Sequence, residues 1–342
     1  MRLSVVVPCF NEELGLDYLH EALVAALSRI TGDFEVLLVD DGSTDATLAV
    51  MRRLHEADPR MRFLALSRNF GKEAAMLAGL SQATGDAVAI MDADLQHPPE
   101  LLAQMIDVLG TGYDQVVARR SRTGEPLLRR MVSRLYYRMM NQAVEIELQD
   151  GVGDFRVLSQ RAVQALLSLG EYNRFSKGLF SWIGFDTATV DYQNVARHSG
   201  SSKWTFRKLV NYGIDGVVSF NNRPLRLAVY LGMLVTMIAF CYAIWVVWHA
   251  VKDGVDSPGY VTIICGVLGL GGLQLMFLGI LGEYLGRIYY ETKRRPHFLV
   301  KEASGDAPVS VALGPEALTR FPRDRNGAGR GLGIASTESN ER

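Results

Sequence analysis

Two long apolar runs near the C-terminus constrain the fold of this chain more than any other feature. Residues 227–251 and 260–281 contain no Asp, Glu, Lys or Arg. As a helix with a rise of about 1.5 Å per residue, each run is long enough to cross a hydrocarbon core of roughly 30 Å. We therefore expect a two-helix transmembrane hairpin over 225–286, rather than two buried helices of a soluble core.

Basic side chains lie on the outer sides of this expected hairpin. They precede the first run at Arg207, Lys208, Arg223 and Arg226 and follow the second at Arg287, Lys293, Arg294 and Arg295. The short loop between the runs has Lys252 as its only basic residue. Positive charge concentrates on the cytoplasmic side of membrane proteins, so both ends of the hairpin are expected in the cytoplasm.

The runs divide the chain into four parts. Residues 1–203 have the composition of a globular domain, and 287–342 form a basic flank and a polar tail, expected to be disordered from about residue 303. Residues 204–224 mix aromatic, aliphatic and basic side chains at helical spacing. This segment is either an interfacial amphipathic helix or a helix packed on the domain.

Overall charge and cysteine content exclude several classes of site. A formal net charge of -1 gives no basic excess for binding nucleic acid. The three cysteines, Cys9, Cys241 and Cys265, have the spacing of neither a disulfide framework nor a zinc site. We expect no nucleic-acid partner.

Strand-like and helix-like segments alternate through the N-terminal domain. Strands are expected over 3–8, 34–40, 62–67 and 87–92, with helices over 14–29, after 43–44, over 72–82 and from 98–99. This order predicts an α/β fold with a mainly parallel sheet, in which ligands bind beyond the carboxyl ends of the strands.

Polar residues follow three of these strands. Part of this polarity fits helix capping, which we favour for Ser43, Thr44 and Asp45. Asp92 and Asp94 are different, because two carboxylates directly after a buried strand repel each other unless a cation neutralises them. Oxygen ligands of this kind suit Mg²⁺ or Mn²⁺ bridging phosphate groups, so a metal-held diphosphate is expected here.

Six motifs together resemble glycosyltransferase family 2. They are VVVPCFNEE (5–13), LLVDDGSTDAT (37–47), RNFGKEAA (68–75), MDADLQHPPEL (91–101), GDFRVL (153–158) and HSGSSKW (198–204). Within that family the chain is similar to polyprenyl-phosphate glycosyltransferases over about residues 3–300. The resemblance implies a GT-A-type nucleotide-sugar-binding domain, a divalent metal, and inverting transfer of one sugar to a polyprenyl phosphate. Its bacterial branch implies a UDP-sugar donor, UDP-glucose or a related one, and a place in the bacterial inner membrane.

The same resemblance assigns candidate site residues. Nucleotide-sugar contacts are implied for Pro8, Asn11, Glu12, Asp40, Asp41, Asp92 and Arg119. Asp92, Asp94 and Gln96 are the implied metal site, Asp154 lies near the acceptor phosphate, and Arg197 and Lys203 meet the diphosphate or the lipid phosphate. Arg119 could also be an ordinary surface charge.

Several alternatives stay open at this level. His97, beside two prolines on an expected surface loop, is interpreted as a non-ligand. The acceptor could be another membrane lipid, such as diacylglycerol, whose hydroxyl needs a base. The fold could also bind nucleotide-sugar without turnover. Glycines of the second run permit close helix contacts within one chain or in a homo-oligomer.

Overall fold

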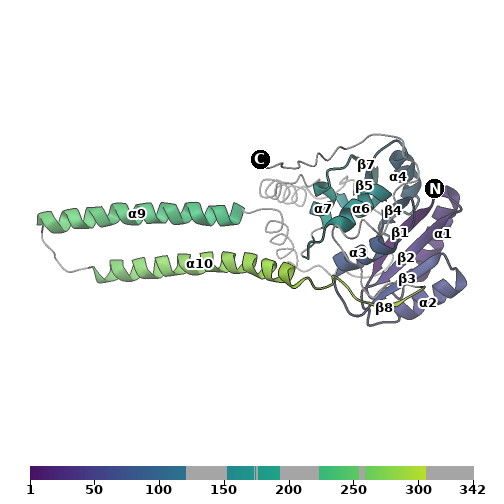
Figure 1. Ribbon diagram of the computed structural model, residues 1–342, viewed down its shortest axis with the longest axis horizontal. Coiled ribbons are helices and arrows are strands. Elements are labelled where there is room, and N and C mark those ends of the chain that lie inside the picture. Colours follow the sequence, from purple (N-terminus) through teal and green to yellow (C-terminus); the bar gives the residue numbers. More distant parts are fainter. Residues whose placement is uncertain (121–151, 173, 175, 193–222, 254–258, 306–342) are drawn as a thin grey trace, which may run out of the picture.

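The computed structural model describes residues 1–120, 152–172, 174, 176–192, 223–253 and 259–305 (Figure 1). Its centre is an eight-stranded sheet in the order β7-β5-β6-β4-β1-β2-β3-β8. The strands are β1 (Leu3–Cys9), β2 (Phe34–Asp40), β3 (Met61–Leu66), β4 (Ala87–Ile90), β5 (Gln115–Arg120), β6 (Val152–Ser159), β7 (Thr187–Tyr192) and β8 (Val300–Ala303).

Helices connect these strands and cover both faces of the sheet. They are α1 (Leu16–Ile30), α2 (Thr47–Ala57), α3 (Lys72–Gln82), α4 (Leu101–Leu109), α6 (Gln160–Ser168) and α7 (Ser176–Trp182), followed by the long α9 (Arg223–Asp253) and α10 (Tyr260–Lys293). The pairs β1–β2, β1–β4, β2–β3 and β5–β7 are parallel, whereas β4–β6, β5–β6 and β3–β8 are antiparallel. The predicted α/β fold with a mainly parallel sheet is confirmed.

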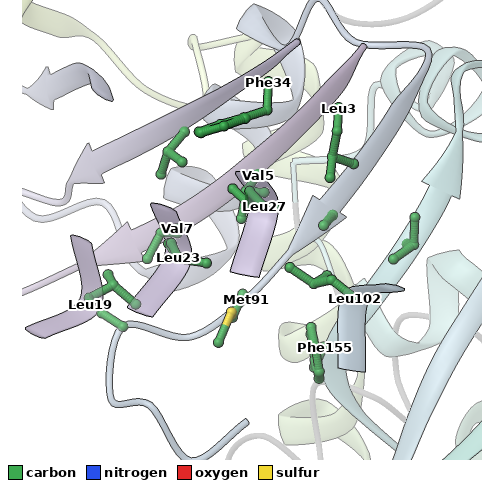
Figure 2. Packing of buried hydrophobic residues seen from close by; sticks show 14 of the residues in the cluster. Leu3, Val5, Val7, Leu19, Leu23, Leu27, Phe34, Met91, Leu102 and Phe155 are labelled. Atoms are coloured by element: carbon green, nitrogen blue, oxygen red, sulfur yellow. The ribbon is translucent and has the colours of Figure 1, made fainter. Parts of the chain in front are cut away.

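Alternate residues of the central strands enter two separate cores. Leu3, Val5 and Val7 of β1 pack with Leu23 and other residues of the helices on one face of the sheet (Figure 2). Between them Val6 points to the other face, where α3, α6 and α7 cover the sheet. A sheet covered on both faces needs continuous apolar strands, which explains the uninterrupted run at 5–7.

The amino edge of the sheet contains a buried carboxylate, Glu35 of β2, which is 1% exposed. Ser4 donates to its Oε1 at 2.6 Å, and the amide and hydroxyl of Thr84 donate to the same oxygen at 2.8 Å. The Arg62 guanidinium lies 2.6 Å from Oε2. Burial alone would raise the pKa of Glu35, but the hydrogen bonds from Ser4, Thr84 and Arg62 outweigh it and hold the pKa below its usual value.

The chain returns to the sheet after α10. β8 adds antiparallel to β3, and Phe298 just before it is 2% exposed. Glu302 forms a two-pronged ion pair with Arg52 of α2, with N–O distances of 2.6 and 2.7 Å. From the sequence we expected this segment to be part of the basic flank and did not expect a strand. A four-residue strand without alternating polarity gives little signal.

The α9–α10 pair extends away from the sheet (Figure 1). Large apolar side chains on both helices are exposed, among them Phe240, Trp245, Trp248, Ile263 and Leu275. Within the residues that the structure describes, no helix combines the length and the apolar content that a membrane crossing needs. The expectation of two crossings is thus not confirmed. The interfacial segment expected over 204–224 lies largely outside the described residues.

Candidate active site

The loops after β1 and β2 are tied together at the carboxyl edge of the sheet. The Asn11 amide donates to Ser43 Oγ at 2.9 Å, and Asn11 Oδ1 accepts from the Thr44 amide at 2.9 Å. Asn11 has a φ of 56°, a conformation that asparagine tolerates better than most residues. The Glu12 amide donates to Thr47 Oγ1 at 2.9 Å. Two of the predicted nucleotide-site residues therefore belong to one rigid corner.

The prediction that the Ser43 and Thr44 side chains cap a helix is wrong. α2 begins at Thr47 with Ala46 as its N-cap. Asp45 comes closest to the expectation, because its Oδ1 accepts from the Thr47 amide at 3.0 Å. Instead of capping α2, Ser43 and Thr44 hydrogen-bond to Asn11 in the loop after β1.

Asp40 and Asp41 are both 3% exposed and accept hydrogen bonds from backbone. The Ser43 amide donates to Asp40, while Asp41 accepts from the amides of Phe70 and Gly71 at 2.7 and 3.0 Å. Next to them, Gly42 has a φ of 67°, and a Cβ there would lie 2.4 Å from the Arg68 carbonyl carbon. A side chain at position 42 cannot be accommodated. Asp41 thus fixes the loop that leads into α3.

Strand register brings Asp92 and Asp154 together. β4 and β6 are antiparallel with Ile90 opposite Arg156. Continuing that register by two residues sets Asp92, just past β4, opposite Asp154 in β6. The two carboxylates come from positions far apart in the sequence and meet at the carboxyl edge.

Lys72, the first residue of α3, bridges these two carboxylates. Its Nζ lies 2.6 Å from Asp92 Oδ1 and 2.6 Å from Asp154 Oδ2. The Lys72 side chain is 44% exposed, compared with 27% for Asp92 and 19% for Asp154. Lys72 belongs to the RNFGKEAA motif (68–75), but the sequence alone suggested no role for it. The available signal was a lysine at a strand-to-helix junction on the same edge as the acidic residues.

The bridge changes the acidity of its members. Burial alone would raise the pKa of Asp154, but the positive charges of Lys72 and Lys177 outweigh it and lower the pKa to about 2. Burial would lower the pKa of Lys72, yet Asp154 and Asp92 raise it above its usual value. Both side chains are therefore fully ionised at neutral pH.

Glu73, adjacent to Lys72, behaves in the opposite way. The hydroxyl of Ser176 in α7 donates a hydrogen bond to the Glu73 carboxylate. Burial and the nearby charge of Asp154 raise the pKa of Glu73 to about 7. Arg174, close by, donates to the carbonyl of Leu169 at 2.7 Å.

Asp94 and Gln96 lie on the short loop between β4 and α4. The Gln96 amide donates to Asp94 Oδ1 at 3.2 Å, and Leu95 between them has a φ of 55°. Among the described residues, no group of three or more His, Cys, Asp or Glu side chains could hold a metal ion. Mg²⁺ usually takes only one or two carboxylates from the protein, together with substrate phosphates and water. The oxygen donors of Asp94 and Gln96 fit that mode.

His97 lies on the loop between β4 and α4, as expected from sequence, but its side chain is half-buried rather than on the surface. Its ring packs against Phe155 at 5.0 Å and Tyr192 at 5.6 Å, between centroids. Burial lowers the pKa of His97 despite the neighbouring Asp92 and Asp94. Phe155 and Tyr192 are distant in sequence, so the prolines beside His97 indicated the loop but not this packing.

The remaining predicted residues are less central. Pro8 is buried in β1, opposite Val39. Arg119 of β5 forms a two-pronged ion pair with Asp191 of β7, with N–O distances of 2.6 and 2.9 Å. This contact fits the alternative of an ordinary surface charge. Arg197 and Lys203 lie outside the described residues.

Comparisons with known proteins identify the family of this chain. The family model "Glycosyl transferase family 2" matches residues 4–167, and "GtrB C-terminal hairpin" matches 223–288. The CsbB protein of Bacillus subtilis (strain 168) is 51% identical over 302 residues, which cover 88% of this chain and 92% of that protein. The bactoprenol glucosyl transferase of Shigella phage SfX is 39% identical over 302 residues, 88% of this chain and 99% of the relative.

Among solved structures, one similar chain is glucosyl-3-phosphoglycerate synthase from Mycobacterium tuberculosis in complex with Mn²⁺, UDP-glucose and phosphoglyceric acid. It is 21% identical, with a TM-score of 0.43, over 64% of this chain and 77% of that chain. The relatives at higher identity identify the family. This chain belongs to glycosyl transferase family 2.

Proposed function

We propose that this protein transfers a single sugar, with inversion, from a nucleotide-sugar to a polyprenyl phosphate at the cytoplasmic face of a bacterial inner membrane. Relatives named bactoprenol glucosyl transferase, 39% and 38% identical over most of the chain, support this acceptor class. They also favour glucose as the sugar and, with the bacterial resemblance, a UDP-sugar donor.

On the donor side, the corner formed by Asn11 and Glu12 would contact the nucleotide. Asp94 and Gln96 would hold Mg²⁺ or Mn²⁺ with the diphosphate. When bound, the metal supplies positive charge at the leaving diphosphate oxygen, where negative charge develops in the transition state. Arg197 and Lys203 would add basic charge to the same group.

The observation that carries the acceptor assignment is the Lys72 bridge. A carboxylate with a pKa of about 2 is a poor proton acceptor at neutral pH, because a general base works best with a pKa near the working pH. A phosphate monoester has a second pKa of about 6 and arrives largely ionised. It needs no base, whereas a lipid hydroxyl does. Asp154 would therefore orient the acceptor rather than take its proton.

The α9–α10 hairpin would bring the enzyme to its lipid. The exposed apolar side chains of both helices would contact acyl chains, since an apolar surface of this extent is unfavourable in water. The acceptor phosphate lies at headgroup depth, and the basic residues that flank the hairpin would attract the anionic lipid surface.

The test uses full-length protein in lipid nanodiscs that contain undecaprenyl phosphate. A panel of UDP- and GDP-sugars is supplied with Mg²⁺, Mn²⁺ or EDTA, and lipid products are measured by mass spectrometry. We expect one hexose per lipid phosphate, from a UDP-sugar and only with metal. Matched nanodiscs with diacylglycerol as the acceptor should give no product. Product with diacylglycerol alone, or nucleotide-sugar binding with no product, would contradict the proposal.

A further inference from the structure

We infer that Lys72 is a positioning residue that holds Asp154 against Asp92, and so sets the distance between the donor and acceptor sides of the site. This inference deepens the proposed function and rests on it. The geometry is direct, because a single Nζ lies 2.6 Å from an oxygen of each carboxylate. The two oxygens are thus no farther apart than about twice that distance.

Charge balance explains why a cation is needed at this position. Without Lys72, the carboxylates of Asp92 and Asp154 would face each other across the β4–β6 register. Asp94 follows Asp92 by two residues and adds a third negative charge. Like charges at such a distance repel, and one of the pair moves away or takes up a proton. Both substrates in the proposed reaction are also anionic. A permanent positive charge within the acidic cluster keeps Asp154 in place without drawing on a cation from solution.

The surrounding structure fixes where Lys72 lies. Asp41 accepts the amide hydrogens of Phe70 and Gly71, the two residues that precede Lys72. Gly71 is the N-cap of α3 and has a φ of 98°, so the chain turns sharply before the lysine. A buried carboxylate at the end of β2 therefore sets the start of α3. Asp41 would act on the reaction through this loop.

The experiment is a double-mutant cycle with Lys72→Met and Asp154→Asn in full-length protein in nanodiscs. If Lys72 acts through Asp154, each single variant lowers the single-turnover rate by roughly 30-fold, with little change in nucleotide-sugar affinity. Adding Lys72→Met to Asp154→Asn then costs less than about 3-fold more. Lys72→Arg keeps the charge and should recover most of the rate. Losses that multiply in the double variant would overturn the inference.

A second readout does not depend on turnover. Lys72→Met leaves Asp92 and Asp154 repelling each other, so Tm should fall by about 3 °C, and Asp154→Asn in that background should restore it. Absence of any such recovery would also overturn the inference. If the wild type transfers no sugar, only the proposed function fails, because this thermal coupling can still be measured.

Arg53→Met is the matched control. Arg53 forms an ion pair with Asp17 at 2.8 Å, but the two side chains are 60% and 52% exposed and lie on α2 and α1. Removing this exposed cation should leave the rate unchanged and Tm within about 1 °C. A comparable loss in this variant would mean that the Lys72 effect is a general response to lost charge.

Discussion

The two edges of the central sheet each hold carboxylates and a cation, but they use them differently. At the amino edge, Glu35 is 1% exposed and its oxygens are occupied by Ser4, Thr84 and Arg62. At the carboxyl edge, Lys72 bridges two carboxylates that are still partly exposed. Fully satisfied buried charge fixes a fold, whereas partly exposed charge stays available to substrates. The first edge should therefore govern stability and the second activity.

The largest expected effect is at the carboxyl edge. Asp94→Asn should lower the single-turnover rate of sugar transfer by about 1000-fold, because it removes a carboxylate from the predicted metal site. Asp154→Asn should cost much less, since its expected role is orientation. Rates measured on both variants with saturating metal check this difference. Equal losses would remove the distinction between the two residues.

Glu35→Ala tests the amino edge. Removing this carboxylate leaves the buried Ser4 hydroxyl and the more exposed donors of Thr84 and Arg62 without their acceptor, which should cost about 3 kcal/mol of unfolding free energy. We expect Tm to fall by roughly 8 °C. The transfer rate per folded molecule, measured well below the new Tm, should be unchanged. A lower transfer rate with an unchanged Tm would contradict the assignment of stability to the amino edge and activity to the carboxyl edge.

The pH dependence of stability should separate Glu35 from Glu73. A lowered pKa means that Glu35 stabilises the protein above the usual glutamate pKa of about 4.3, and that this contribution is lost as the pH falls below that value. Glu73, with a pKa of about 7, must ionise at a cost that grows as the pH rises from about 4.3 to 7. At about 1.4 kcal/mol per pKa unit, that cost is on the order of 4 kcal/mol once the pH exceeds 7.

Thermal scans of Glu35→Gln and Glu73→Gln against wild type, between pH 3.5 and 8, measure both effects. Glu73→Gln should gain Tm relative to wild type with rising pH and reach a plateau above about pH 7. Wild type should lose its advantage over Glu35→Gln only at the acidic end. The same pH trend in both variants would contradict the assigned directions.

The smallest expected effect concerns β8. Arg52→Ala removes the ion pair with Glu302, whose side chains are 47% and 34% exposed. Exposed pairs contribute little, so we expect Tm to fall by no more than about 1 °C, and by less at high salt. Tm measured at low and high ionic strength checks this. A much larger loss would mean that β8 detaches as a unit when the pair is broken.

The sequence was sufficient for features with local signals. The first four strands and their mainly parallel pairing follow from the alternation of apolar strands and helices, and the acidic residues after β4 follow from the motif at 91–101. The Lys72–Asp154 contact joins residues 82 positions apart, and the β4–β6 register also pairs residues distant in sequence, which no local pattern encodes. The packing of the His97 ring and the Asn11–Thr44 contact could not be predicted for the same reason, because their partners come from distant elements or a neighbouring loop.

The return of the chain to β3 has a consequence for biogenesis. The edge partner of β3 is made only after both hairpin helices have been synthesised, because Leu64 pairs with Ala303. Until then β3 is an open edge, and open edges invite pairing with other chains. A ribosome-bound intermediate that ends before residue 300 should therefore be more prone to aggregation and proteolysis than the finished chain. Maturation of the catalytic domain would wait for the hairpin.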